Sequence, residues 1–129
     1  MTRSLSKILY VEDDPDIQEV AKIALEEIGG FTVKICNSGL EAVKDAPGFM
    51  PEFILLDVMM PGMDGPSTLV ALRELDGFKD TPIAFMTAKV MDSEVKRYMD
   101  MGAVDVIAKP FDPMTLSDKI KGIWQGLQR

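Results

Sequence analysis

The chain has 129 residues with 14 basic and 21 acidic side chains, which leave a net charge of −7. This length fits one domain, residues 1–129 with a core of about 6–128 and no output domain, and the negative charge argues against nucleic acid or an anionic membrane as a partner. No apolar stretch reaches the roughly 20 residues of a membrane span, no signal peptide is apparent, and the single cysteine, Cys36, fits a reducing compartment, so we expect a cytoplasmic protein.

Five short apolar runs alternate along the chain with five segments of helical spacing. The predicted strands cover residues 8–11, 31–36, 53–57, 82–87 and 104–108. The predicted helices begin at Asp14-Pro15, Ser38, Pro66, near Met91 and at Asp112-Pro113, and they end at Gly29-Gly30, Pro47-Gly48, Gly77, near Gly102 and at Leu127. This repeated strand–helix order predicts an α/β fold with a parallel sheet covered by helices on both faces.

The run from Phe53 to Leu56 is unbroken and apolar, and it ends on a single carboxylate, Asp57. Such a run is typical of a strand that is buried on both faces of a parallel sheet. Pro61, Gly62 and Gly65 follow it and predict a loop. Open α/β sheets bind their ligands at the carboxyl ends of their strands, so Asp57 is a candidate site residue.

Other predicted strands also end on polar groups, and in a parallel sheet these ends share one edge. They would bring together Glu12, Asp13, Asp57, Thr87 and Lys109. Carboxylates about 4 Å apart repel each other by roughly 4 kcal/mol, so the cluster requires cations. Lys109 is one, and a cluster of oxygen ligands in a chain without histidine points to Mg²⁺, with Mn²⁺ possible, as another. An acid, a lysine, a hydroxyl and a hard cation are suited to handling a phosphoryl group.

Four motifs in this order resemble a bacterial response-regulator receiver domain, and the match runs nearly end to end. They are ILYVEDDP at 8–15, LDVMMPGMDG at 56–65, MTA at 86–88 and AKPF at 108–111. The resemblance implies a flavodoxin-like (βα)5 sheet of strand order 2-1-3-4-5. It also implies that Asp57 accepts a phosphoryl group from a phosphohistidine on a sensor histidine kinase or a histidine phosphotransfer protein, and that Thr87 and Lys109 bind the phosphoryl oxygens.

The same resemblance assigns a metal site and a partner surface. The groups implied to hold Mg²⁺ are Asp13, Asp57 and the backbone carbonyl of Met59, with Glu12 contributing through water. The surface implied to meet a downstream protein, whose identity stays open, includes Ala88, Lys89, Val90, Val106 and Pro110. The Lys109–Pro110 peptide is expected to be cis.

Val106 departs from the family pattern, because receiver domains usually carry an aromatic or histidine ring there that follows the movement of the threonine. Valine is too short and too rigid at χ1 to copy that movement. We therefore expect the loop from Thr87 to Val90 and the helix beginning near Met91 to move by themselves. The alternative is that the domain barely changes and its partner reads the phosphorylated edge directly. Of the ten methionines, Met91 and Met99 are expected to fill core.

The pattern leaves three classes of function: a phosphorylation switch, an adaptor, and an enzyme or cofactor module on a related fold. A phosphorylation-activated switch is favoured over a phosphorylation-independent adaptor, because an adaptor has no reason to gather repelling carboxylates. A phosphoaspartyl hydrolase would need a second aspartate two residues after Asp57, where Met59 stands. A flavodoxin would not place the acidic segment 12–16 beside a phosphate. The chain is therefore predicted to be a signalling module rather than an enzyme.

Overall fold

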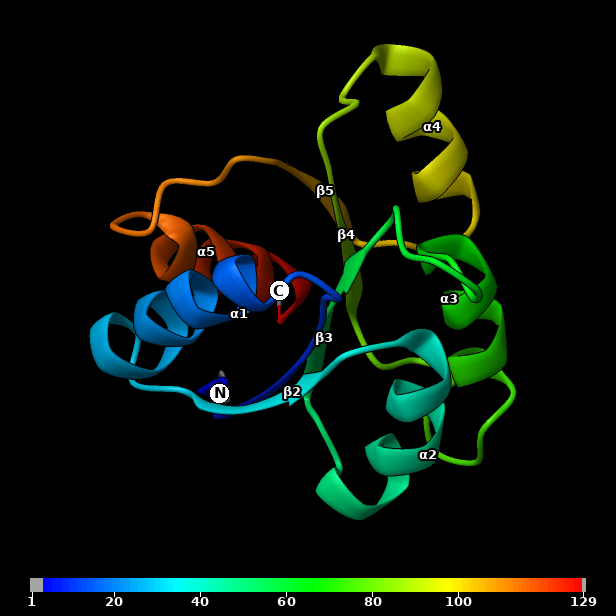
Figure 1. Cartoon of the computed structure of the whole chain (residues 1–129), viewed down its shortest axis with the longest axis horizontal. Helices are drawn as coiled ribbons and strands as arrows, with labels where there is room; N and C mark the ends of the chain where they lie inside the picture. Colours follow the sequence, from blue (N-terminus) through cyan, green and yellow to red (C-terminus); the bar gives the residue numbers. More distant parts are fainter. Residues whose placement is uncertain (1–3, 129) are drawn as a thin grey trace.

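A five-stranded parallel sheet in the order β2-β1-β3-β4-β5 forms the centre of the computed structural model, which describes residues 4–128 (Figure 1). The strands are β1 (Lys7–Val11), β2 (Thr32–Cys36), β3 (Phe53–Asp57), β4 (Ile83–Thr87) and β5 (Asp105–Ala108). The predicted flavodoxin-like architecture and strand order are confirmed. Strand β3 lies at the centre with all five residues buried, as its unbroken apolar run indicates.

Helices cover both faces of this sheet. Helix α1 (Pro15–Lys22), its π-helical continuation η1 (Ile23–Ile28) and α5 (Leu116–Leu127) lie on one face, and α2 (Gly39–Phe49), α3 (Gly65–Arg73) and α4 (Asp92–Asp100) lie on the other (Figure 1). Alternating strand residues serve the two cores: Ile8 and Tyr10 point to the α1–α5 side, and Leu9 and Val11 point to the α2–α4 side. The sheet is thus buried on both faces, as parallel sheets require.

Side-chain caps start several of the helices as the sequence predicts. The Asp14 carboxylate accepts hydrogen bonds from the backbone N–H groups of Asp16 and Ile17, at 2.9 and 3.4 Å, with Pro15 in the first turn. The Ser38 hydroxyl accepts from Glu41 N at 3.1 Å. These bonds satisfy donors that the first helical turn leaves without partners.

Three predicted helix boundaries are wrong, and one of them is the end of α3, which stops at Arg73 rather than at Gly77. Helix α2 continues through Pro47 to Phe49 and ends at Met50, whose φ of 55° is left-handed. The last turn of a helix tolerates proline when packing holds it, although proline cannot donate a backbone hydrogen bond. Helix α5 begins only at Leu116, because the carboxylate of Asp112 accepts from Met114 N and closes a turn before the helix.

The prediction that Met91 and Met99 fill core is also wrong, since their side chains are 69% and 43% exposed. Cys36, by contrast, is a buried free thiol at the end of β2. Among residues 4–128, no helix combines the length and the apolar character needed to cross a membrane.

Candidate functional site

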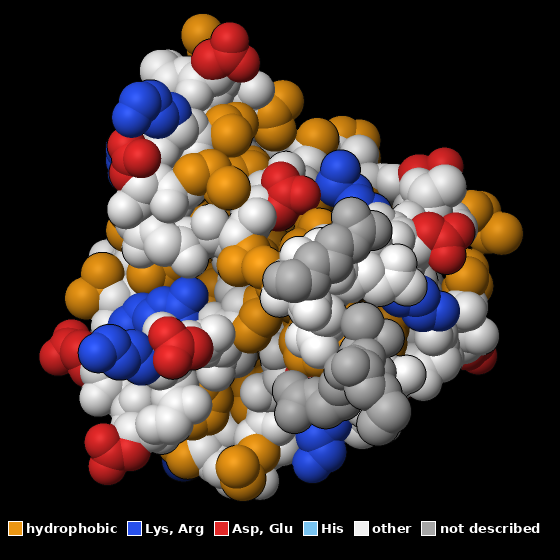
Figure 2. All heavy atoms as spheres, turned by 180° about the vertical axis from the view of Figure 1, so that it is seen from behind, with side chains coloured by type: hydrophobic (Ala, Val, Ile, Leu, Met, Phe, Trp, Pro, Cys, Tyr) orange, Lys and Arg blue, Asp and Glu red, His pale blue; other side chains and the backbone are white. Residues whose placement is uncertain are grey.

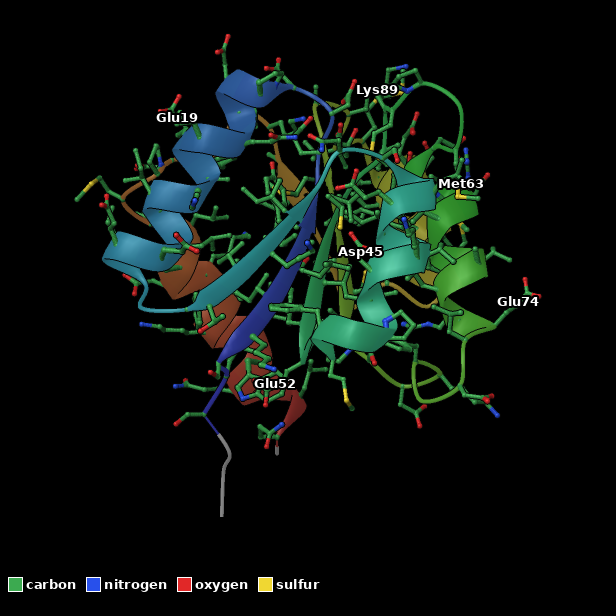
Figure 3. All side chains as sticks on the ribbon, turned by 60° about the horizontal axis from the view of Figure 1, so that its bottom comes forward. Glu19, Asp45, Glu52, Met63, Glu74 and Lys89 are labelled. Carbon is green, nitrogen blue, oxygen red and sulfur yellow. The ribbon has the colours of Figure 1, made fainter. Side chains whose placement is uncertain are left out.

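The carboxyl end of the sheet gathers the predicted site residues. Glu12 and Asp13 follow β1, Asp57 ends β3, Thr87 ends β4 and Lys109 follows β5. Figure 3 gives the orientation: Lys89, just beyond β4, lies at one end of the sheet, and Glu52, just before β3, lies at the other. The parallel strand order alone brings these distant residues to one edge.

Three carboxylates form an acidic cluster at this edge: those of Glu12, Asp13 and Asp57. Each offers an oxygen within 4.8 Å of the others. Glu12 and Asp57 are buried, whereas Asp13 is exposed. Close, partly buried like charges repel strongly, so the cluster is an unfavourable arrangement unless positive charge accompanies it.

Lys109 supplies positive charge within the protein. Its ammonium donates to Glu12 Oε1 at 2.8 Å and to Asp57 Oδ1 at 3.2 Å. Burial by itself lowers the pKa of Lys109, but the hydrogen bond to Glu12 and the charge of Asp57 outweigh burial and raise the pKa. Lys109 is therefore charged at neutral pH and links two carboxylates that would otherwise repel each other.

Glu12 is also held from a second direction, by a residue that sequence reasoning missed. The Tyr10 hydroxyl, on β1, donates to Glu12 Oε1 at 3.1 Å, and the backbone N–H of Asp14 donates to Oε2 at 3.3 Å. From the sequence, Tyr10 is only a member of the apolar run at residues 8–11. The signal that would have found it is its spacing, since residues two apart on a strand lie on the same side.

The Asp57 carboxyl has a strongly altered acidity. Burial, followed by the charge of Glu12, raises its pKa from 3.8 to about 6, and Lys109 opposes both. The ionised form of Asp57 is thus less favourable than that of an ordinary aspartate. A perturbed carboxyl with defined charged neighbours marks a candidate functional group.

On the other side of Asp57, Thr87 lies buried at the end of β4. Its hydroxyl accepts a hydrogen bond from the backbone N–H of Lys89 at 3.1 Å. Its carbonyl accepts from Lys109 N at 2.9 Å, which connects the ends of β4 and β5. The hydroxyl of Thr87 is therefore hydrogen-bonded to the loop between β4 and α4.

The loop after β3 passes close to the end of that strand. Gly65 N donates to the carbonyl of Val58 at 2.9 Å, and a Cβ on Gly65 would lie 2.6 Å from Asp57 O. Only glycine permits this approach. The side chain of Met59 is 70% exposed. The loop thus fixes the Met59 backbone beside Asp57 while its side chain faces outward.

The residues of the predicted partner surface differ in their exposure to solvent. Ala88, Lys89, Val90 and Pro110 are exposed, and the Lys109–Pro110 peptide is cis, as the resemblance implies. Val106 is half-buried and packs against the core between the sheet and helices α2–α4.

Comparison with solved structures places the fold. The chemotaxis protein CheY4 of Vibrio cholerae superposes with a TM-score of 0.86 at 28% identity, over 93% of this chain and 99% of that one. The receiver domain of a signal transduction histidine kinase from Syntrophus aciditrophicus gives a TM-score of 0.81 at 32% identity, over 96% and 93%. The fold is therefore that of signal receiver domains.

Sequence comparison gives the family. The model for the response regulator receiver domain matches residues 8–121. The transcriptional regulatory protein CpxR homolog of Haemophilus influenzae is 35% identical over 92% of this chain and 50% of that protein. The DNA-binding response regulator MtrA of Mycolicibacterium smegmatis is 34% identical over 89% and 49%. The chain spans about half the length of these relatives, and it belongs to the response regulator receiver domain family.

Proposed function

We propose that this chain is a phosphorylation-activated switch of a two-component phosphorelay in which Asp57 accepts the phosphoryl group. The observation that carries the proposal is the lone carboxylate of Asp57 at the end of the central strand, beside Lys109 and within an acidic cluster. These 129 residues contain no histidine, so the phosphohistidine donor lies outside them, and we propose a sensor histidine kinase or a histidine phosphotransfer protein as its source. The free thiol of Cys36 fits a role in the cytoplasm.

In this reaction an Asp57 oxygen attacks the phosphorus of the partner's phosphohistidine, the P–N bond breaks, and the imidazole leaves with the electron pair and takes up a proton. The ammonium of Lys109, now 3.2 Å from Asp57 Oδ1, stabilises negative charge on the transferred group. The hydroxyl of Thr87 turns to donate to another phosphoryl oxygen. At neutral pH Asp57 is mostly ionised despite its raised pKa, and it can act as the nucleophile.

The acidic cluster also fits a divalent cation, because all of its ligands are hard oxygens. Asp13, Asp57 and the Met59 carbonyl would hold Mg²⁺ or Mn²⁺, which supplies positive charge against the carboxylates and the phosphoryl oxygens when bound. Glu12 is held by Tyr10, Lys109 and the Asp14 backbone, which fits a contribution to the metal through water.

Labelling with acetyl phosphate and Mg²⁺, followed by mass spectrometry, tests the proposal. Asp57 is expected to carry the label, and Asp57→Asn and chelation should each abolish it. Asp16→Asn is the control, because Asp16 is an exposed acid close to the cluster in sequence. Undiminished labelling of Asp57→Asn would refute the assignment. Binding of a partner that is unaffected by labelling would instead support the phosphorylation-independent adaptor.

A further inference from the structure

Helix α4 is attached to the rest of the molecule through very little buried surface. Of its nine residues, all of which the structure describes, only Tyr98 is buried, with 3% of its surface exposed. Figure 1 shows α4 projecting beyond the other helices, and Figure 2 shows hydrophobic side chains exposed on this projecting part. Tyr98 is therefore the main anchor of α4.

The Tyr98 ring lies against the strand that ends at Thr87. Its centroid is 4.9 Å from that of Phe85 on β4, with the two rings tilted by 55°. Phe85 and Thr87 are two residues apart on β4, so their side chains lie on the same side of the sheet. The Tyr98 hydroxyl lies 3.5 Å from Glu94 Oε2, within the same helix. Tyr98 thus connects α4 to the strand that carries Thr87.

A solvent-open cavity of about 630 Å³ lies beside Tyr98, between α4 and the loop after β3. Thr87 and Tyr98 both line it, together with Met60 and Asp64 from the loop after β3. This open space beside a weakly held helix leaves room for that helix to move.

We propose that Tyr98 is the positioning residue about which α4 turns when phosphorylation of Asp57 draws the Thr87 hydroxyl away from loop 88–91. The inference rests on the proposed function. It assigns to a residue of α4 the coupling role that receiver domains usually give to a ring on β5. In this chain the β5 position holds the half-buried Val106, which packs against the same core as Tyr98.

The sequence of events follows from the contacts. When the Thr87 hydroxyl turns toward a phosphoryl group on Asp57, its oxygen moves away from the backbone N–H of Lys89. Loop 88–91 is then released, and α4 begins directly after it. Because Tyr98 is the buried contact of α4, the helix turns about Tyr98, using the cavity, and its exposed residues change position.

Fluorine NMR tests this on the unaltered chain, which has only two tyrosines. Tyr10 contacts Glu12 and reports the acidic cluster, and Tyr98 reports α4. With 3-fluorotyrosine in both positions, beryllofluoride and Mg²⁺ should shift both signals, which Tyr10→Phe and Tyr98→Phe assign. A stationary Tyr98 signal accompanied by shifted α4 amides would overturn the inference.

Three variants then separate coupling from stability. Tyr98→Leu should reduce the beryllofluoride-induced amide shifts of residues 96–100 to less than about half of their wild-type size. Tyr98→Phe, which keeps the ring, should leave these shifts at their wild-type size. Phe53→Leu is the control, because Phe53 is buried on the α1–α5 side of the sheet and should lower stability without altering the α4 response.

The labelling rate with acetyl phosphate should be unchanged in Tyr98→Leu. A wild-type α4 response in Tyr98→Leu, or an equal loss in Phe53→Leu, would refute a coupling role for Tyr98. If Asp57 takes up no phosphoryl group or beryllofluoride and neither tyrosine signal shifts, the proposed function fails and this inference with it. If the Tyr10 signal shifts and α4 stays fixed, only this inference fails.

Discussion

The two sides of Asp57 are built in opposite ways. Toward β1 and β5, the charged groups of Glu12 and Lys109 are fixed by hydrogen bonds to each other and to Tyr10 and Asp57. Toward β4, the hydroxyl of Thr87 is bonded to a loop, a cavity follows, and α4 beyond it is anchored by Tyr98.

The difference has a physical basis. Buried charges are stable only when their partners stay in place, so the side that handles charge is held rigid. A helix that buries little surface can shift at small free-energy cost, so the other side can move. The molecule separates the chemistry of the phosphoryl group from the movement that reports it.

The largest effect is expected from Lys109→Met, which breaks the rigid side. Glu12 and Asp57 would remain buried beside each other without the ammonium, so the free energy of unfolding should fall by about 3 kcal/mol. Urea unfolding measures this change. Lys96→Met is the control, because the Lys96–Asp100 pair is exposed, and its loss should cost less than about 1 kcal/mol. Equal effects of the two substitutions would contradict the comparison.

Tyr10→Phe should weaken the rigid side less. It removes one hydrogen bond to a charged acceptor, while Glu12 Oε1 keeps Lys109, so about 1.5 kcal/mol of stability should be lost. In a double-mutant cycle, most of this loss should disappear when Glu12 is already replaced by Gln. Additive effects would show that Tyr10 acts through packing alone.

The raised pKa of Asp57 predicts that the free energy of unfolding depends on pH. This dependence tests whether the ionised carboxylate of Asp57 destabilises the folded protein. The folded pKa, raised by burial to about 6 from 3.8, means that the folded protein binds more protons than the unfolded chain between these values. Stability should therefore fall as pH rises from about 4 to about 6, and this fall should be absent in Asp57→Asn. Urea unfolding of both proteins in a chelator gives the difference, and parallel curves would contradict it.

The smallest effect concerns the lifetime of the phosphoryl group and tests the side of Asp57 that faces β4 and the cavity. Met59 and Lys89 both line the cavity on that side of Asp57, and neither is an acid or an amide suited to positioning a water molecule. Met59→Asn should speed loss of the label a few-fold, because an amide can orient the attacking water. Met114→Asn, at an equally exposed methionine, is the control. Equal lifetimes would show that the side chain of Met59 has no part in hydrolysis.

The sequence predicts the architecture well because its signals are local or follow from topology. The unbroken run ending at Asp57 identifies the central strand, and the parallel order brings Glu12, Asp57 and Lys109 to one edge. Boundaries fail where a local rule meets packing, as at Pro47, which α2 includes.

Contacts between side chains are predicted less well. The hydrogen bond from Tyr10 to Glu12 depends on the lengths and conformations of these two side chains. The sequence pattern shows only that Tyr10 belongs to an apolar run. The anchoring of α4 does not follow from the sequence either, because Met91, Tyr98 and Met99 share helical spacing and only the tertiary structure selects Tyr98 for burial.

The close approach of Gly65 to the end of β3 has a consequence for mutational tolerance. Any side chain there would collide with the backbone carbonyl of Asp57, with a Cβ only 2.6 Å away, so accommodating one would displace the loop that carries Met59. Met59 itself projects outward. A saturation scan of this loop for retained phosphorylation should therefore find two neighbours in space with opposite tolerance: nearly every residue type accepted at position 59, and glycine alone at position 65.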